Sequence, residues 1–244
     1  MPEQITAIFG EFDNTNILYI LAVYSPAFAA VLLVLRYYGL KGLGSYMRRL
    51  TLLRIPAKWW LFLLIGIPLH SYLGAVIMGT GLFEFPYTPW YYVLPPLLHM
   101  LLLGPVEEFG WRGLALPLFQ RRFTPLWSGV MIGAIWGVWH LPAFFIGGTV
   151  HSEWGFISFF FGVIALSVIM TALFNVSRGS ILIAGLFHFQ INNPIWPNAQ
   201  PWDSILFIIT AVVVVLIYRE KMIKGKDIVT GIFMPGDKRY KVKV

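Results

Sequence analysis

The chain has 244 residues, of which 58% are hydrophobic and only 12% are charged. Soluble domains carry about 25% charged residues, so this composition excludes a domain covered by water and favours a membrane protein. The absence of cysteine excludes disulfides and thiolate sites, and the net charge of +7 is typical of basic cytoplasmic loops, so nucleic-acid binding is not expected.

Seven apolar runs approach the length of about 20 residues that a helix needs to cross a bilayer. They are residues 17–38, 57–80, 90–118, 125–146, 154–174, 180–197 and 203–219. Gly104-Pro105 interrupts the third run, which predicts a span followed by a separate short helix. The predicted fold class is therefore all-α, a polytopic transmembrane helix bundle of about seven spans, with residues 1–244 as one integral membrane domain.

Basic residues alternate between the loops of this scheme. They fall between spans one and two, three and four, and five and six, and in the tail: Lys41, Arg48, Arg49, Arg54, Lys58, Arg121, Arg122, Arg178, Lys221, Lys224, Lys226, Lys238, Arg239, Lys241 and Lys243. The other loops hold Glu84, Glu153 and Asp203 and no Lys or Arg. The positive-inside rule then predicts a multi-pass protein with its N-terminus outside and its C-terminus in the cytoplasm, in the cell membrane if the source is prokaryotic.

The fourth span carries three glycines at a spacing of four, Gly129, Gly133 and Gly137. They share one helix face and permit close approach of a neighbouring backbone, which predicts that this span lies inside the bundle.

Ionisable side chains inside a membrane are functional candidates because they are costly to bury. In the segment Glu107 to Arg112, the side chains of Glu108 and Arg112 are four residues apart and are predicted to pair. Glu107 points about 100° away on a helix, so it is predicted to have no such local partner and to be free for proton transfer. The alternative is a buried Glu–Arg pair that only fixes helix packing.

Two further spans carry polar pairs at helical spacing. Trp136 and His140 share one face, as do His188 and Asn192. The imidazoles can bind a water or a metal, and the amide can donate to a developing oxyanion. Alternatively, these groups are hydrogen-bonded packing residues between helices. Convergence of all three spans near mid-membrane would produce a cavity suited to attack of water on a carbonyl.

The three motifs, EExxxR, aromatic-xxx-His and HxxxN, together resemble the intramembrane CAAX-protease and bacteriocin-processing (CPBP) family. The resemblance covers about Pro105 to Asn192, and the catalytic core is placed at about residues 90–197. Trp136 stands where the family usually has Phe. The matching site residues are Glu107, Glu108, Arg112, His140, His188 and Asn192.

The resemblance implies an intramembrane endopeptidase. In a metal-free mechanism, which we favour, Glu107 and His140 activate water while His188 and Asn192 bind the oxyanion, with Glu108 beside them. Arg112 and Trp136 would support the site. In the alternative, His140, His188 and Glu107 hold zinc and leave a position open for water. The residues themselves do not separate the two.

The implied substrates are membrane-associated proteins or peptides, including lipidated ones, met within the lipid bilayer. A lipid tail that enters between spans would bring the scissile bond from the cytoplasmic side. A non-enzymatic bacteriocin-immunity or regulatory protein that uses the same polar cavity is the alternative function. A transporter is disfavoured because no inverted repeat is present. The sequence does not determine the oligomeric state.

Overall fold

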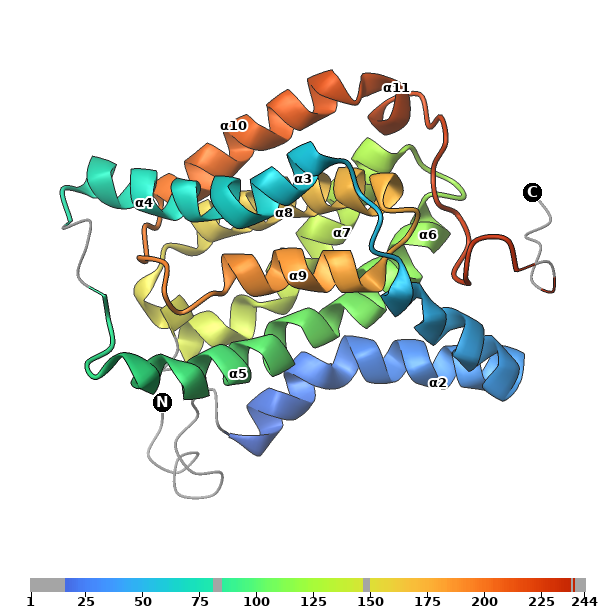
Figure 1. Ribbon diagram of the computed structural model, residues 1–244, viewed down its shortest axis with the longest axis horizontal. Coiled ribbons are helices and arrows are strands. Elements are labelled where there is room, and N and C mark those ends of the chain that lie inside the picture. The colour runs from blue at the N-terminus through green and yellow to red at the C-terminus, as the bar shows by residue number, and fades with distance from the viewer. Residues whose placement is uncertain (1–15, 81–84, 147–149, 238, 240–244) are drawn as a thin grey trace.

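The computed structural model describes residues 16–80, 85–146, 150–237 and 239, and its regular elements in that part of the chain are helical (Figure 1). The α-helices are α2 (Ile17–Met47), α3 (Ala57–Leu61), α4 (Ile67–Met78), α5 (Leu94–Leu103), α6 (Leu116–Phe119), α7 (Pro125–Trp139), α8 (Phe156–Val176), α9 (Ile181–Ile191), α10 (Trp202–Ile217) and α11 (Arg219–Met222). The all-α prediction is confirmed.

Within these residues, four helical segments are long and apolar enough to cross a membrane: Ile17–Thr51, Ala57–Met78, Pro125–Phe145 and Phe156–Val176. The helices α9 and α10 are apolar but shorter. The predicted sixth span is therefore too long, because its helix ends at Ile191 and residues 192–197 are not helical.

The predicted third span is broken. Helix α5 ends at Leu103, a 3₁₀ turn covers Gly104–Val106, a π-helical stretch covers Phe109–Ala115, and α6 follows. Pro105 cannot donate a backbone hydrogen bond, so the regular ladder stops there. The break places Glu107 and Glu108 at an irregular point of the backbone, where their side chains meet other helices.

Helix α8 is the most buried helix and packs against α7 and α10. The predicted close approach of the fourth span is confirmed, since a Cβ on Gly133 would lie 2.7 Å from the Cα of Ile164 and one on Gly129 would lie 3.1 Å from the Cα of Val168. Helix α9 lies in the middle of the view in Figure 1, between α4 and α5.

The end of the bundle on the right of Figure 1 is closed by buried polar contacts. Arg49 is fully buried and donates to the carbonyl oxygens of Gly113, Gly179 and Ile232 at 2.6, 2.9 and 3.1 Å. Near it, Asn175 accepts a hydrogen bond from the backbone N–H of Val229 at 2.7 Å. These bonds hold residues 229–232 of the tail across the ends of the helices.

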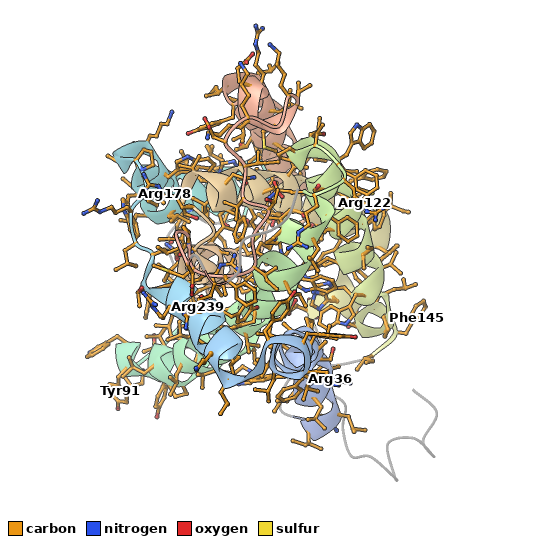
Figure 2. The ribbon with its side chains drawn as sticks, turned by 90° about the vertical axis from the view of Figure 1, so that its right-hand side faces the viewer. Arg36, Tyr91, Arg122, Phe145, Arg178 and Arg239 are labelled. Atoms are coloured by element: carbon orange, nitrogen blue, oxygen red, sulfur yellow. The ribbon has the colours of Figure 1, made fainter. Side chains whose placement is uncertain are left out.

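Figure 2 looks on to this closed end, where it labels four arginines: Arg36, Arg122, Arg178 and Arg239. Glu84, Lys238, Lys241 and Lys243, which entered the predicted charge pattern, lie outside the described residues.

Candidate active site

The three predicted polar spans meet at one cavity of about 380 Å³. Its lining includes the side chains Glu107, Trp136, His140, His188 and Asn192. Glu108 and Arg112 are not part of the lining and lie fully buried behind it. The structure thus brings the predicted residues together in two layers, one facing the cavity and one supporting it.

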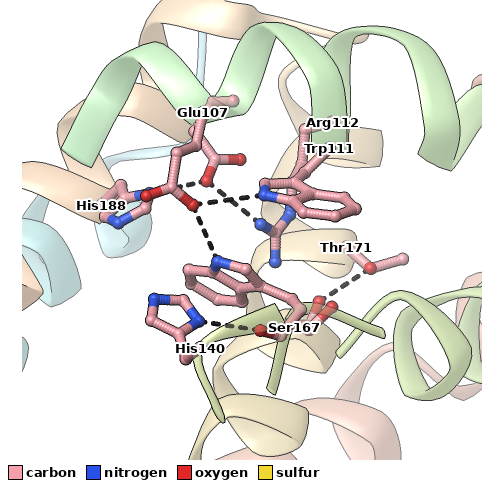
Figure 3. Close-up of polar contacts among 9 residues, drawn as sticks. Glu107, Trp111, Arg112, His140, Ser167, Thr171 and His188 are labelled. Atoms are coloured by element: carbon pink, nitrogen blue, oxygen red, sulfur yellow. Dashed lines mark hydrogen bonds and ion pairs between the residues drawn. The ribbon is translucent and has the colours of Figure 1, made fainter. Parts of the chain in front are cut away.

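Glu107 is held by two indole N–H groups. Its Oε2 accepts from Nε1 of Trp136 at 2.8 Å and from Nε1 of Trp111 at 3.2 Å (Figure 3). The prediction that Glu107 has no local partner is therefore wrong, because Trp111, one turn later, faces the same carboxylate. In the part of the chain that is described, no group is hydrogen-bonded to Oε1, which leaves this oxygen available to accept a proton.

Glu108 joins two other site residues. Its Oε1 accepts from Nη1 of Arg112 at 3.1 Å and from Nδ1 of His188 at 2.7 Å. The predicted pairing of Glu108 with Arg112 is confirmed. The guanidinium of Arg112 also lies over the ring of Trp136, at 4.7 Å from its centroid. One buried carboxylate therefore balances a buried cation and orients an imidazole.

His140 follows α7 as its C-terminal cap. Its Nδ1 lies 2.8 Å from the carbonyl oxygen of Trp136. A carbonyl can only accept, so Nδ1 carries the proton and Nε2 of the neutral ring carries the lone pair. This imidazole can therefore accept a proton at the cavity.

Gly104 brings His188 and Asn192 together. A Cβ on Gly104 would lie 2.9 Å from Nδ2 of Asn192 and 3.2 Å from Nε2 of His188. Both nitrogens thus lie on the side of Gly104 that a larger residue's side chain would fill, and both residues line the cavity. Gly104 was predicted only to interrupt a helix, although its place three residues before the acidic pair was a usable signal.

His151 also lines the cavity and was missed from the sequence. It lies in the 3₁₀ turn Val150–Glu153, and its ring centroid is 5.4 Å from that of His140. Burial lowers the pKa of His151 to about 4, so its ring is neutral at physiological pH. His151 could not be predicted from helical spacing because it lies in a loop between two predicted spans. Only the folding of this turn against the site brings the imidazoles of His151 and His140 together.

The zinc alternative requires three ligands that converge. Among the described residues, no group of three His, Asp or Glu side chains is arranged to hold a metal ion. Oε2 of Glu107 is occupied by two indoles, and Nδ1 of His188 is occupied by Glu108. These contacts leave Oε1 of Glu107 and the Nε2 atoms of His140 and His188 without a hydrogen bond among the described residues, so the choice between the metal-free and the zinc mechanism stays a prediction.

Residues 88–193 match the family described as type II CAAX prenyl endopeptidase, Rce1-like. The matched segment holds all three motifs, so the core of this chain is similar to that family. Over 163 residues, 64% of this chain, the sequence is 29% identical to CAAX prenyl protease 2 from Methanococcus maripaludis. The match spans 58% of the length of that relative. The resemblance inferred from the three motifs is confirmed, and the protein is an integral membrane protein.

Proposed function

We propose that the protein is an intramembrane endopeptidase that hydrolyses peptide bonds of membrane-associated proteins or peptides, including lipidated ones. The observation that carries this function is the cavity at which Glu107, His140, His188 and Asn192 converge from three spans. The name of the methanococcal relative, a CAAX prenyl protease, supports the same reaction.

In the proposed mechanism, Glu107 and His140 activate a water molecule. The two indoles fix the carboxylate of Glu107 through Oε2, so Oε1 accepts a proton as the water oxygen bonds to the scissile carbonyl carbon. Nε2 of His140 accepts a hydrogen bond from the second hydrogen of the water. The carboxylate of Glu107 is therefore in position before the substrate binds, which reduces the reorganisation needed in the transition state.

Asn192 and His188 are proposed to bind the oxyanion. The amide of Asn192 donates through Nδ2, and the imidazolium form of His188 donates through Nε2, while Glu108 balances its charge at Nδ1. Proton return from Glu107 to the amide nitrogen then lets the carbon–nitrogen bond break and releases the two peptide products. Arg112 acts through Glu108, with which it pairs, and through the ring of Trp136, over which it lies.

The proposed topology places the N-terminus outside and the C-terminus in the cytoplasm, as the distribution of basic loops predicts. We propose that the chain forms one membrane domain, with the catalytic core at about residues 90–197.

Comparative membrane proteomics tests the proposed function. Cells that express wild-type protein are compared with cells that express Glu107→Ala, and uncut precursors are expected to accumulate in the variant. Equal processing in both strains would contradict proteolysis. If the physiological effect also survives the substitution, a non-enzymatic immunity or regulatory role in the same cavity becomes the better explanation.

Substitution of Gly104 by alanine is expected to slow cleavage. The added Cβ would meet Asn192 and His188 at 2.9 Å and displace the oxyanion donors. A misplacement of about 1 Å in a catalytic group can cost about 10²-fold in rate. Steady-state kinetics should show the loss in kcat. Gly44→Ala is the matched control, because a Cβ there meets nothing within 4 Å, and equal kinetics of the two variants would contradict the packing argument.

Treatment with a metal chelator is expected to leave the initial rate of cleavage unchanged. The expectation follows from the metal-free roles proposed for Glu107 and His140. The rate is measured on purified protein in lipid vesicles before and after dialysis against the chelator. Loss of activity that returns with added zinc would support the metal mechanism instead.

A further inference from the structure

The chain after α7 places a second imidazole beside His140. The 3₁₀ turn Val150–Glu153 is closed by the backbone N–H of Trp154, which donates to the carbonyl oxygen of His151 at 3.1 Å. The ring centroid of His151 lies 5.4 Å from that of His140 and 5.3 Å from that of Phe159. The ring of Phe159 also lies 5.2 Å from that of His140. One aromatic ring of α8 therefore packs against both imidazoles and fixes their separation.

The two nitrogens of His151 have different surroundings. Nδ1 is buried and makes no hydrogen bond to the described residues. Nε2 is accessible, on a side chain that lines the cavity. A buried N–H without an acceptor is rarer in proteins than a buried acceptor without a donor, so the single proton of the neutral ring is placed on Nε2. His151 therefore presents an N–H donor to the cavity.

His140 presents the opposite group to the same cavity. Its Nδ1 donates to the carbonyl oxygen of Trp136 at 2.8 Å, so its Nε2 carries a lone pair. The indole of Trp136 donates to Glu107 at 2.8 Å, so one residue holds both groups that are proposed to activate water. No hydrogen bond joins the rings of His140 and His151 directly in the part of the chain that is described. A donor and an acceptor on neighbouring rings are thus both left for a bound molecule.

The proposed mechanism leaves one direction of the attacking water without a partner. Its two O–H groups are directed to Glu107 and His140, and one lone pair forms the bond to the scissile carbon. The second lone pair needs a donor, because a water inside a protein is usually held by about three hydrogen bonds. The N–H group of His151 lies in the same cavity and is the donor that this lone pair lacks.

We propose that Nε2–H of His151 positions the attacking water, by donating a hydrogen bond to the lone pair that does not form the new bond. This inference rests on the proposed function, since it assigns a role within the same reaction. With three directions of the water fixed, its remaining lone pair points toward the carbonyl carbon, as a near-attack arrangement requires. His151 gives up no proton in this step, because the proton of the water goes to Glu107 and its oxygen to the carbonyl carbon.

Substitution of His151 by phenylalanine removes the donor and keeps an aromatic ring in place. The ring contacts that phenylalanine can retain are with Phe144, Trp154 and Phe159, at 5.5, 5.1 and 5.3 Å between centroids. The expected result is a loss of about 10–10²-fold in kcat, the scale of a misplaced reacting group, with KM little changed. His151→Gln, which carries an N–H donor on a side chain of similar length, is expected to restore most of kcat.

His99→Phe is the matched control. His99 in α5 also has a buried nitrogen without a hydrogen-bond partner among the described residues, but it does not line the cavity. Its kinetics in lipid vesicles are expected to equal those of the wild type, and thermal unfolding checks the fold of all three variants. An unchanged kcat in His151→Phe overturns the proposal. So does a raised KM at unchanged kcat, which would mean that His151 binds substrate, or a loss that His151→Gln does not restore.

A second measurement does not depend on cleavage. Nitrogen NMR of protein labelled at its histidine nitrogens reports which nitrogen of each ring carries the proton, and the signals absent from His151→Phe belong to His151. At neutral pH, Nε2 of His151 is expected to carry the proton and Nδ1 to be bare, whereas a proton on Nδ1 overturns the proposal. If the wild-type protein cleaves nothing, the proposed function fails, and the NMR result still decides whether His151 presents a donor to the cavity.

Discussion

Replacement of Glu107 by glutamine is expected to lower the rate of peptide cleavage by about 10²–10⁴-fold, the usual contribution of a positioned general base. The amide oxygen of glutamine can still accept from the indoles of Trp111 and Trp136, which now bond to Oε2 at 3.2 and 2.8 Å. The variant therefore keeps the contacts that hold the side chain and loses only its ability to take a proton. Initial rates in lipid vesicles measure the effect, and thermal unfolding checks the fold.

Glu220→Gln is the matched control for this substitution. Glu220 is a partly exposed acid in α11 that pairs with Lys224 and Lys226, away from the cavity. Its substitution is expected to leave cleavage unchanged. If Glu107→Gln retains the wild-type rate in a correctly folded protein, Glu107 is not the base, and His140 becomes the residue to test for that role.

The substitution Glu108→Ala is expected to destabilise the protein by about 3–5 kcal/mol, the usual cost of removing one partner from a buried ion pair. Arg112 would lose the carboxylate that it pairs with at 3.1 Å, and His188 would lose the acceptor of its Nδ1, at 2.7 Å. Both groups are almost fully buried, so water cannot replace the lost partner. Unfolding in detergent measures the stability, and cleavage is expected to fall with it.

A double variant distinguishes two effects of losing Glu108: the unpaired charge left on Arg112 and the missing acceptor that orients His188. Glu108→Leu combined with Arg112→Met removes both charges, and apolar replacement of a buried pair is often neutral or stabilising. Its stability is expected to return toward the wild-type value while cleavage stays low, because Nδ1 of His188 still has no acceptor. A double variant as unstable as Glu108→Ala would refute the unpaired charge as the cause, and a fully active one would show that Glu108 does not orient His188.

Composition and helical spacing were enough to predict a large part of the fold and the contacts of the site that lie within one helical stretch. The low charge content excludes a soluble fold whatever the order of the residues. The apolar runs that approach the length of a membrane span give the approximate positions of the helices. Pairing of Glu108 with Arg112 was predictable because both lie in one continuous stretch, where helical geometry sets the separation of side chains. Helix ends were less predictable, as α9 shows by ending at Ile191.

Only the tertiary structure decided which groups meet across helices. The bond from Trp136 to Glu107 joins residues 29 positions apart, and that from His188 to Glu108 joins residues 80 positions apart. Neither spacing carries a periodic signal, since the path between the residues passes through turns and other spans. The same applies to His151, whose turn folds back on to His140. The sequence by itself determined which polar residues the membrane would have to bury, and packing of the spans determined how they are paired.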